Sequence, residues 1–248
     1  MAKKRYTIPD ALRGLSLISM ILYHTVWDLV NIYGVRIPWF RTNAAFIWQQ
    51  SICWTFIILS GFCWHFGSRK FKRGLIVLAG AAVISVVTIV FLPSCAIRYG
   101  VLGLIAAGML LLIPLDKLFQ KIQPIIGAAV SFSLFLVTKN IPSGFIGSRN
   151  NCLAVMPFEL YRNEFTAWLG FPHADFFSCD YFPIIPWLFL YITGYFLYFI
   201  FRRYDLLKYL SMFSVRPLEF MGRHSLIIYM VHQPVIYGAL FLIFSFAQ

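Results

Sequence analysis

The chain is dominated by long apolar stretches that contain few or no charged residues. A helix needs roughly 20 such residues to cross the hydrocarbon core of a bilayer. Lipid offers no partner to an unpaired backbone N–H, so each crossing must be helical. We therefore predict an all-α, polytopic transmembrane helix bundle of about seven spans. The expected spans are Ala11–Ile32, Ala44–Phe66, Gly74–Leu92, Tyr99–Leu115, Pro124–Thr138, Phe182–Phe201 and Ser225–Phe246.

The composition supports a surface that faces lipid. Charged residues make up only 12% of the chain, against roughly 25% in a soluble domain. No linker, repeat or low-complexity tract divides the sequence, which predicts a single domain over residues 1–248. The basic N-terminus resembles that of a signal peptide. However, no small-residue cleavage site follows, and His24 and Asp28 interrupt the apolar run, so we interpret it as the first permanent span.

Basic residues concentrate in the loops on one side of this bundle. With the N-terminus inside, 15 of the 21 Lys and Arg residues fall in inner segments. The positive-inside rule then predicts an N-in, C-out orientation. The same distribution explains the net charge of +12 as membrane topology and excludes a nucleic-acid-binding protein. The six outer basic residues are Arg36, Arg41, Arg98, Lys139, Arg149 and Arg162.

A long outer loop covers residues 140–181. Its segment 153–171 is apolar but broken by charges, and we expect an amphipathic or re-entrant piece at the membrane interface. Cys95, Cys152 and Cys179 all fall on the predicted outer side, where a disulfide is permitted. Cys152 and Cys179 flank most of the loop and are the preferred pair, with Cys95 as the alternative partner for either.

The first predicted span contains two ionisable residues, His24 and Asp28. Such groups are costly inside a membrane and usually serve function. Their i, i+4 spacing places both on one helical face, so Asp28 can orient His24 and support it as a general base. We therefore predict that His24 and Asp28 are catalytic. A histidine–carboxylate hydrogen bond that locks two helices together is the structural alternative.

The last predicted span carries His232 and Gln233 directly before Pro234. Proline frees a backbone carbonyl and kinks a helix, which leaves polar groups near mid-membrane. Hydrogen bonding between helices around the kink is one interpretation. Contact with a substrate is the other, and it makes His232 and Gln233 candidate binding residues.

Three further candidates lie near the outer ends of predicted spans. Asp180 and Tyr181 precede two prolines at the entrance to one span and could bind a sugar hydroxyl or amine. A helix cap explains Asp180 equally well. Arg98 begins another span and is costly to bury unpaired, so we expect it to meet a carboxylate or an anionic substrate group. An exposed arginine at the interface is its alternative interpretation.

Basic residues also form a collar at the inner ends of the spans. Orientation and anionic lipid explain most of them, but the collar could also bind the phosphates of a nucleotide-bearing donor. The sequence contains no G-x-G-x-x-G or P-loop motif, so such a donor is not held by a Rossmann or Walker element. No CxxC motif or cysteine–histidine cluster suggests a metal, and we predict none. The collar consists of Arg13, Arg69, Lys70, Lys72, Arg73 and Arg223.

Several motifs in order along the chain resemble one family of transmembrane acyltransferases. They begin with DALRGLSLISMILYHTVWDL and continue with FIILSGFCWHF, YGVLGLIAAGMLL, DYFPIIPW and GRHSLIIYMVHQPV. These segments resemble the bacterial relatives of the heparan-α-glucosaminide N-acetyltransferase catalytic domain. The ten residues between Arg13 and His24 match a spacing also found in the related acyltransferase-3 family.

The resemblance implies transfer of an acetyl or other acyl group from cytoplasmic acetyl-CoA or another acyl-CoA, an EC 2.3.1 type of reaction. The acceptor would be an extracytoplasmic sugar hydroxyl or amine. The family's intramembrane histidine then corresponds to His24 and its arginine to Arg13. Related proteins often carry a histidine where Gly103 stands. The implied setting is the bacterial cytoplasmic membrane, with membrane lipids around a multi-pass protein that is a possible homodimer.

Two other functional classes use the same residues without acyl chemistry. A transporter or flippase of a lipid-linked or anionic metabolite could have a similar polar cavity. The lack of an obvious inverted repeat disfavours a secondary transporter. A membrane scaffold would leave the His24 and Asp28 pair unexplained.

Overall fold

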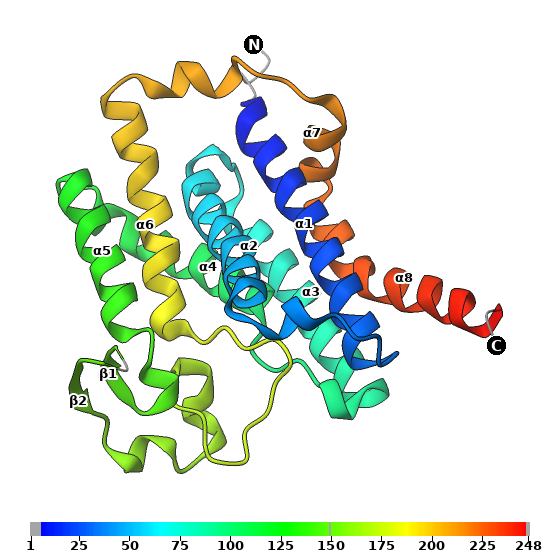
Figure 1. Ribbon diagram of the computed structural model, residues 1–248. Coiled ribbons are helices and arrows are strands. Elements are labelled where there is room, and N and C mark those ends of the chain that lie inside the picture. Colours follow the sequence, from blue (N-terminus) through cyan, green and yellow to red (C-terminus); the bar gives the residue numbers. More distant parts are fainter. Residues whose placement is uncertain (1–5, 149, 247–248) are drawn as a thin grey trace. The chain divides into compact units, whose positions relative to one another are not determined.

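The computed structural model describes residues 6–148 and 150–246 (Figure 1). Four of the basic residues used to predict the orientation, Lys3, Lys4, Arg5 and Arg149, lie outside this part. The prediction of a mainly helical fold is confirmed, and most predicted spans match helices to within a few residues. The α-helices are α1 (Thr7–Asn31), α2 (Asn43–Phe62), α3 (Lys70–Phe91), α4 (Val101–Phe119), α5 (Pro124–Thr138), α6 (Ile184–Arg203), α7 (Arg216–Arg223) and α8 (Ser225–Phe246).

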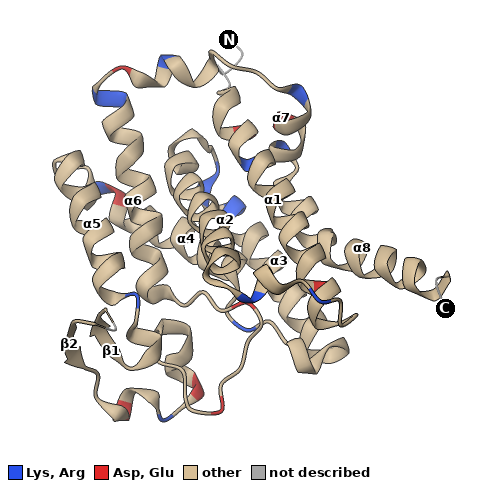
Figure 2. Ribbon diagram, in the orientation of Figure 1, with Lys and Arg blue, Asp and Glu red and all other residues tan. Residues whose placement is uncertain are grey.

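Six helices in the described part of the chain are long and apolar enough to cross a membrane. They are α2, α3, α4, α5 and α6, with α8 as the sixth; short 3₁₀ turns that end at Phe66 and Ser143 extend α2 and α5. Figure 2 shows that α8 carries no Lys, Arg, Asp or Glu. Helix α1 is also long but contains Asp10, Arg13 and Asp28, and it is not among the six. The count of seven spans and the N-in, C-out orientation therefore stay predictions.

The chain divides into two compact units. The first contains residues 1–56 and 205–248, and the second contains residues 57–204. The single-domain prediction is not tested by this division, and we describe each unit separately.

Close packing of α1 against α7 and α8 organises the first unit. The contact between α1 and α7 depends on glycine, because a Cβ on Gly14 would lie 2.0 Å from the carbonyl oxygen of Leu218. On the α7 side, a Cβ on Gly222 would lie 1.8 Å from the carbonyl oxygen of Asp10. Helix α7 was not predicted, because this eight-residue amphipathic helix is too short and has too few apolar residues to resemble a membrane span.

The second unit contains two pairs of neighbouring helices, α3 with α4 and α5 with α6. The hydroxyl groups of Ser131 on α5 and Thr193 on α6 lie 3.0 Å apart and form a buried hydrogen bond. Tyr191 and Tyr195 on α6 are fully buried and form much of the interior. Small residues at helix contacts and hydrogen bonds between helices are typical of packing inside membranes.

The loop between α5 and α6 has its own small structure. Strands β1 (Phe145–Gly147) and β2 (Cys152–Val155) pair in antiparallel fashion, a short sheet that an all-α prediction did not include. Two 3₁₀ helices follow, Phe158–Tyr161 and Glu164–Leu169. The segment expected to be amphipathic or re-entrant thus consists of a strand and two short turns. Charges at Glu159, Arg162 and Glu164 come too often for a longer apolar helix face to form.

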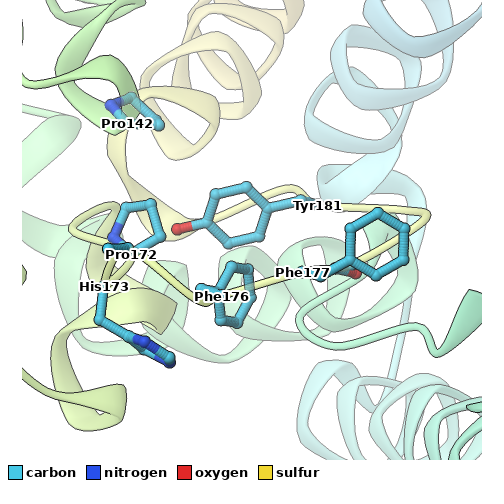
Figure 3. Close-up of a pocket in the computed structure, with 8 residues that line it drawn as sticks. Pro142, Pro172, His173, Phe176, Phe177 and Tyr181 are labelled. Atoms are coloured by element: carbon cyan, nitrogen blue, oxygen red, sulfur yellow. The ribbon is translucent and has the colours of Figure 1, made fainter. Parts of the chain in front are cut away.

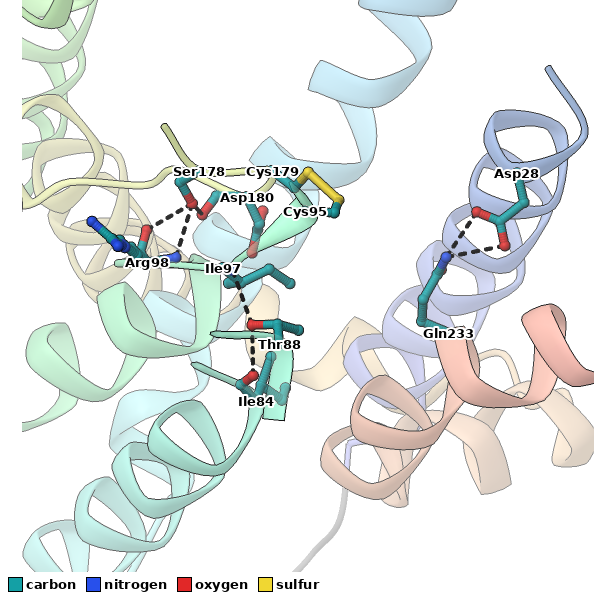
Figure 4. Close-up of a disulfide and its surroundings, with 10 residues drawn as sticks. All are labelled: Asp28, Ile84, Thr88, Cys95, Ile97, Arg98, Ser178, Cys179, Asp180 and Gln233. Atoms are coloured by element: carbon teal, nitrogen blue, oxygen red, sulfur yellow. Dashed lines mark hydrogen bonds between the residues drawn. A yellow bond between two sulfur atoms is a disulfide. The ribbon is translucent and has the colours of Figure 1, made fainter. Parts of the chain in front are cut away.

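The preferred disulfide prediction was wrong. The structure joins Cys95 to Cys179, while Cys152 is free and exposed (Figure 4). The backbone explains the pairing, since the N–H of Cys179 donates to the carbonyl of Ala96 at 3.1 Å. That bond brings the two cysteines to a Cα–Cα distance of 5.3 Å, within the range that a disulfide requires. Cys152 instead occupies strand β2.

Candidate active site

The polar residues predicted on the first and last spans come together inside the first unit. Asp28 on α1 is fully buried, and its two carboxylate oxygens accept hydrogen bonds from Nε2 of Gln233 on α8 at 2.8 and 3.0 Å. Figure 4 shows Gln233 reaching from α8 toward Asp28. Buried carboxylates need such partners, because an unpaired buried charge is very costly. The interaction ties two segments 205 residues apart in the sequence.

The expected direct contact between Asp28 and His24 is replaced by this bond. Within the described residues, both oxygens of Asp28 are bound to Gln233, and the neighbour of His24 is His232. The two imidazole ring centres lie 4.9 Å apart. The i, i+4 spacing does place His24 and Asp28 on one face of α1, but α8 supplies a partner to each. In the structure the side-chain partner of Asp28 is therefore Gln233.

The tautomer of His232 follows from its hydrogen bond. Nδ1 of His232 lies 2.6 Å from the backbone carbonyl oxygen of Tyr229. A carbonyl only accepts, so Nδ1 carries the proton and the other ring nitrogen, Nε2, has a free lone pair in the neutral ring. That Nε2 atom is buried, and no described residue donates a hydrogen bond to it.

Gln233 presents a second acceptor of the same kind. Its amide nitrogen faces Asp28, since a carboxylate can only accept, and this fixes the orientation of the amide. The remaining oxygen, Oε1, is buried and receives no hydrogen bond from the described part of the chain. His232 and Gln233 thus offer two neighbouring buried acceptors, which a ligand with N–H or O–H groups would satisfy.

Arg13 lies about 16 Å along α1 from His24, eleven residues at 1.5 Å each. Its Nη1 atom forms an ion pair with Oδ1 of Asp10 at 2.7 Å. Asp10 is buried beside Gly222 of α7, so the pair also stabilises the contact between α1 and α7. Arg13 therefore has a structural role in addition to any role in binding.

The three predicted binding residues near the long loop lie together in the second unit. Asp180 accepts a hydrogen bond through Oδ2 from the backbone N–H of Val101 at 3.0 Å, so it caps the first turn of α4. A cap was the alternative interpretation of Asp180, although on a different helix. Arg98 does meet a carboxylate, with Nη1 3.7 Å from Oε1 of Glu164.

Tyr181 donates a hydrogen bond from its hydroxyl to the carbonyl of Ala167 at 2.6 Å. Burial raises the pKa of the Tyr181 hydroxyl above its ordinary value, so the group stays protonated and keeps this bond. Tyr181 also lines the pocket in Figure 3, together with His173 and Phe176. His173 and Phe176 were not predicted as site residues. Their signal in the sequence is a histidine close to two phenylalanines in PHADFF, residues 172–177.

A second polar group that was not predicted as a site lies within the second unit. The Tyr195 hydroxyl donates to Oδ1 of Asp116 at 2.6 Å. Lys70, one member of the predicted basic collar, places its ammonium 3.2 Å from the ring centre of Trp64. His65 stacks on Tyr198 with ring centres 4.3 Å apart. Lys70 is thus held by an aromatic ring as well as by its position at the start of α3.

Within the described residues, no three His, Cys, Asp or Glu side chains gather in a way that could hold a metal ion. Gly103 on α4 has open space around it, since no atom of the described chain lies within 4 Å of a Cβ built there.

Comparison with known proteins gives one match. Residues 5–234 match the family model described as heparan-alpha-glucosaminide N-acetyltransferase, catalytic. The match covers both units and includes every residue discussed in the first unit. No curated protein and no solved structure is detectably similar to the chain.

Proposed function

The chain belongs to the heparan-alpha-glucosaminide N-acetyltransferase catalytic family, and from this membership we propose the details of its reaction. The family and the six apolar helices indicate a membrane acetyltransferase. We propose that acetyl-CoA is the donor and that a hydroxyl or amine of a carbohydrate is the acceptor. The donor would enter from the cytoplasm and the acceptor from the opposite side of a bacterial cytoplasmic membrane.

The observation that carries this proposal is the group formed by His24, Asp28, His232 and Gln233. Buried polar groups inside a membrane protein are costly and default to function. Here two of them, Nε2 of His232 and Oε1 of Gln233, are acceptors without a donor in the described chain. An acceptor substrate brings the missing donors, because its nucleophile is an O–H or N–H group.

The proposed reaction uses these groups in sequence. His232 and Gln233 accept hydrogen bonds from the nucleophile and orient it, while Asp28 fixes the position of the Gln233 amide. The nucleophile attacks the thioester carbonyl, and His24 takes its proton as general base. The carbon–sulfur bond then breaks, and the departing thiolate takes the proton from His24. Transient transfer of the acyl group to His24 is the alternative route to the same products.

Arg13 is the proposed contact for the donor. It lies on the same helix as His24, about 16 Å away by the rise of an α-helix, which leaves room for the pantetheine arm of the donor between them. Its charge suits a phosphate group. Asp10 already pairs with Arg13, so donor binding would share or replace that ion pair.

Transfer of a radiolabelled acetyl group tests the proposal. Purified protein in nanodiscs would be given labelled acetyl-CoA and a panel of saccharides. Loss of a positioned general base typically slows a reaction about 10²–10⁴-fold, so His24→Ala should lose transfer by that factor and still bind coenzyme A. His224→Ala is the matched control, because His224 is exposed, caps the end of α7 and places Nδ1 2.8 Å from the backbone carbonyl of Phe220 on that helix.

Two results would contradict the proposal in different ways. Transfer by His24→Ala at the wild-type rate would show that His24 is not catalytic. A wild-type protein that neither hydrolyses acetyl-CoA nor acetylates any saccharide would exclude the acyltransferase function.

A further inference from the structure

The loop between α5 and α6 contains a preformed pocket of about 410 Å³. Figure 3 shows Pro172, His173, Phe176 and Tyr181 arranged around this space. Its volume lies within the roughly 300–1,000 Å³ of typical small-molecule sites. All residues that line the pocket belong to the second unit.

Aromatic rings form one side of the pocket. The ring centres of Phe176 and Tyr181 lie 4.8 Å apart with the planes inclined at 54°. Tyr99 stacks against Phe176 with nearly parallel planes, which holds the Phe176 ring in place. Phe177 adds an apolar side chain that is 57% exposed. Aromatic faces carry a negative quadrupole and favour contact with weakly positive C–H groups.

Polar atoms occur beside these rings. Nε2 of His173 is buried and has no hydrogen-bond partner among the described residues. Oε1 of Glu164 lies 3.7 Å from that nitrogen and also 3.7 Å from Nη1 of Arg98. The hydroxyl of Tyr181 already donates to Ala167, so toward a ligand it can only accept.

The charge balance argues against an anionic ligand. Among the described residues, no lysine or arginine lines the pocket. The positive charge of Arg98 offsets the negative charge of Glu164. Together with a neutral His173, these groups beside the pocket carry no net charge. A phosphate or sulfate group would find no cation in contact with it.

Backbone and covalent links hold the pocket rigid. The Cys95–Cys179 disulfide lies next to Ser178, which lines the pocket and accepts a hydrogen bond from the N–H of Arg98 at 2.9 Å. Pro142 and Pro172 restrict the backbone on the other side. A preformed site loses little conformational entropy on binding, which favours recognition of a small ligand.

We propose that this pocket binds a pyranose ring of the carbohydrate acceptor that carries no anionic group. A pyranose has an apolar C–H face, which suits the rings of Phe176 and Tyr181, and an edge of hydroxyl donors, which suits Nε2 of His173 and the hydroxyl oxygen of Tyr181. A lipid chain would leave the polar atoms unsatisfied, and an anionic sugar would meet no opposite charge in the lining. The inference rests on the proposed function only in taking the acceptor to be a carbohydrate.

Saturation-transfer NMR on the protein in nanodiscs tests this binding without any acyl donor. The probes are methyl β-D-glucopyranoside, glucuronic acid as the charged counterpart and sorbitol as the acyclic one. The measurement is made on the wild type and on a His24→Ala background, so a failure of catalysis does not affect it. We expect saturation transfer to the uncharged pyranoside, with Phe176→Ala and His173→Ala each weakening its binding about tenfold.

Phe165→Ala is the matched control, since Phe165 belongs to the same loop and is 85% exposed but does not line the pocket. It should bind the pyranoside as the wild type does. An intact Cys95–Cys179 disulfide in each variant shows that the loop has folded. If Phe176→Ala lacks this disulfide, the milder Tyr181→Phe variant takes its place. The inference is overturned if the pyranoside gives no transfer, if sorbitol or glucuronic acid binds as well, or if only Phe165→Ala weakens binding.

Discussion

The amide nitrogen of Gln233 donates to both carboxylate oxygens of Asp28, at 2.8 and 3.0 Å, across a separation of 205 residues. This bond fixes α8 against α1 at the depth where His24 and His232 adjoin. It also determines which atom of Gln233 remains to accept a hydrogen bond. A structural interaction and the chemistry of the proposed site therefore depend on the same side chain.

Removal of Gln233 should destabilise the protein more than neutralisation of Asp28. Gln233→Ala leaves a buried carboxylate without its donor, and loss of a hydrogen bond to a charged group costs about 1.5–3 kcal/mol. Asp28→Asn keeps the shape and can still pair with the Gln233 amide, so it should cost less, about 0.5–1.5 kcal/mol. Unfolding in detergent, followed by tryptophan fluorescence, measures both. Equal stability of Gln233→Ala and the wild type would contradict the role of this bond.

Two replacements of His232 separate its structural and binding roles. His232→Asn retains a donor near Nδ1 for the Tyr229 carbonyl but lacks the Nε2 acceptor. His232→Gln extends an amide to the position of Nε2. We expect the Asn variant to fold normally and to show a KM for the acceptor raised about tenfold, the effect of one lost hydrogen bond of about 1.4 kcal/mol. The Gln variant should recover part of the loss, and an Asn variant with unchanged KM would exclude an acceptor role for Nε2.

We expect the Cys95–Cys179 disulfide to form in the folded protein and to stabilise it. It closes a loop of 84 residues, so Cys179→Ser should destabilise the fold by roughly 2–4 kcal/mol. Cys152→Ser is the control and should have little effect, because that thiol is free and exposed. Mass spectrometry after alkylation without reductant should find Cys152 modified and Cys179 unmodified. Modification of Cys179 would contradict the pairing.

Helix positions followed from the sequence because membrane spans have a strong physical signal. The predicted ranges Pro124–Thr138 and Ser225–Phe246 coincide with α5 and α8. Long apolar runs bounded by proline or charge leave few alternatives to a helix. The short helix α7 has no such signal, since half of its residues are polar or glycine, and its place against α1 depends on the tertiary contact at Gly14.

The residues of the candidate site were predicted from the sequence, but their pairing was not. His24 and Asp28 were predicted because ionisable groups are costly inside a membrane span. His232 and Gln233 were predicted because they precede Pro234. Helical spacing fixes only which residues share a face of one helix. Whether Asp28 binds Gln233 or His24 depends on how α8 lies against α1. Cys179 was wrongly paired with Cys152 for the same reason, because the sequence does not show which distant segments lie side by side.

Thiol labelling of intact cells tests the predicted N-in, C-out orientation. The positive-inside rule places Lys72 inside and Asn150 outside, and both residues are exposed. In a background with Cys53, Cys63 and Cys152 changed to Ser, an impermeant maleimide should label Asn150→Cys and not Lys72→Cys. Permeabilised cells are the control, where both should react. Labelling of Lys72→Cys alone in intact cells would reverse the orientation.

Two glycine-to-alanine changes in the second unit should have opposite effects on stability. A Cβ on Gly194 of α6 would lie 2.1 Å from the carbonyl oxygen of Ile58 on α2, and backbone atoms cannot move aside as a flexible side chain can. Gly194→Ala must therefore separate the two helices, and overpacking of this kind costs about 1–3 kcal/mol.

Gly103 on α4 has open space instead. Gly103→Ala should gain up to about 1 kcal/mol from its higher helix propensity. Thermal unfolding of both variants in one detergent checks the pair, and a Gly194→Ala protein as stable as Gly103→Ala would show that α2 and α6 do not touch at this point.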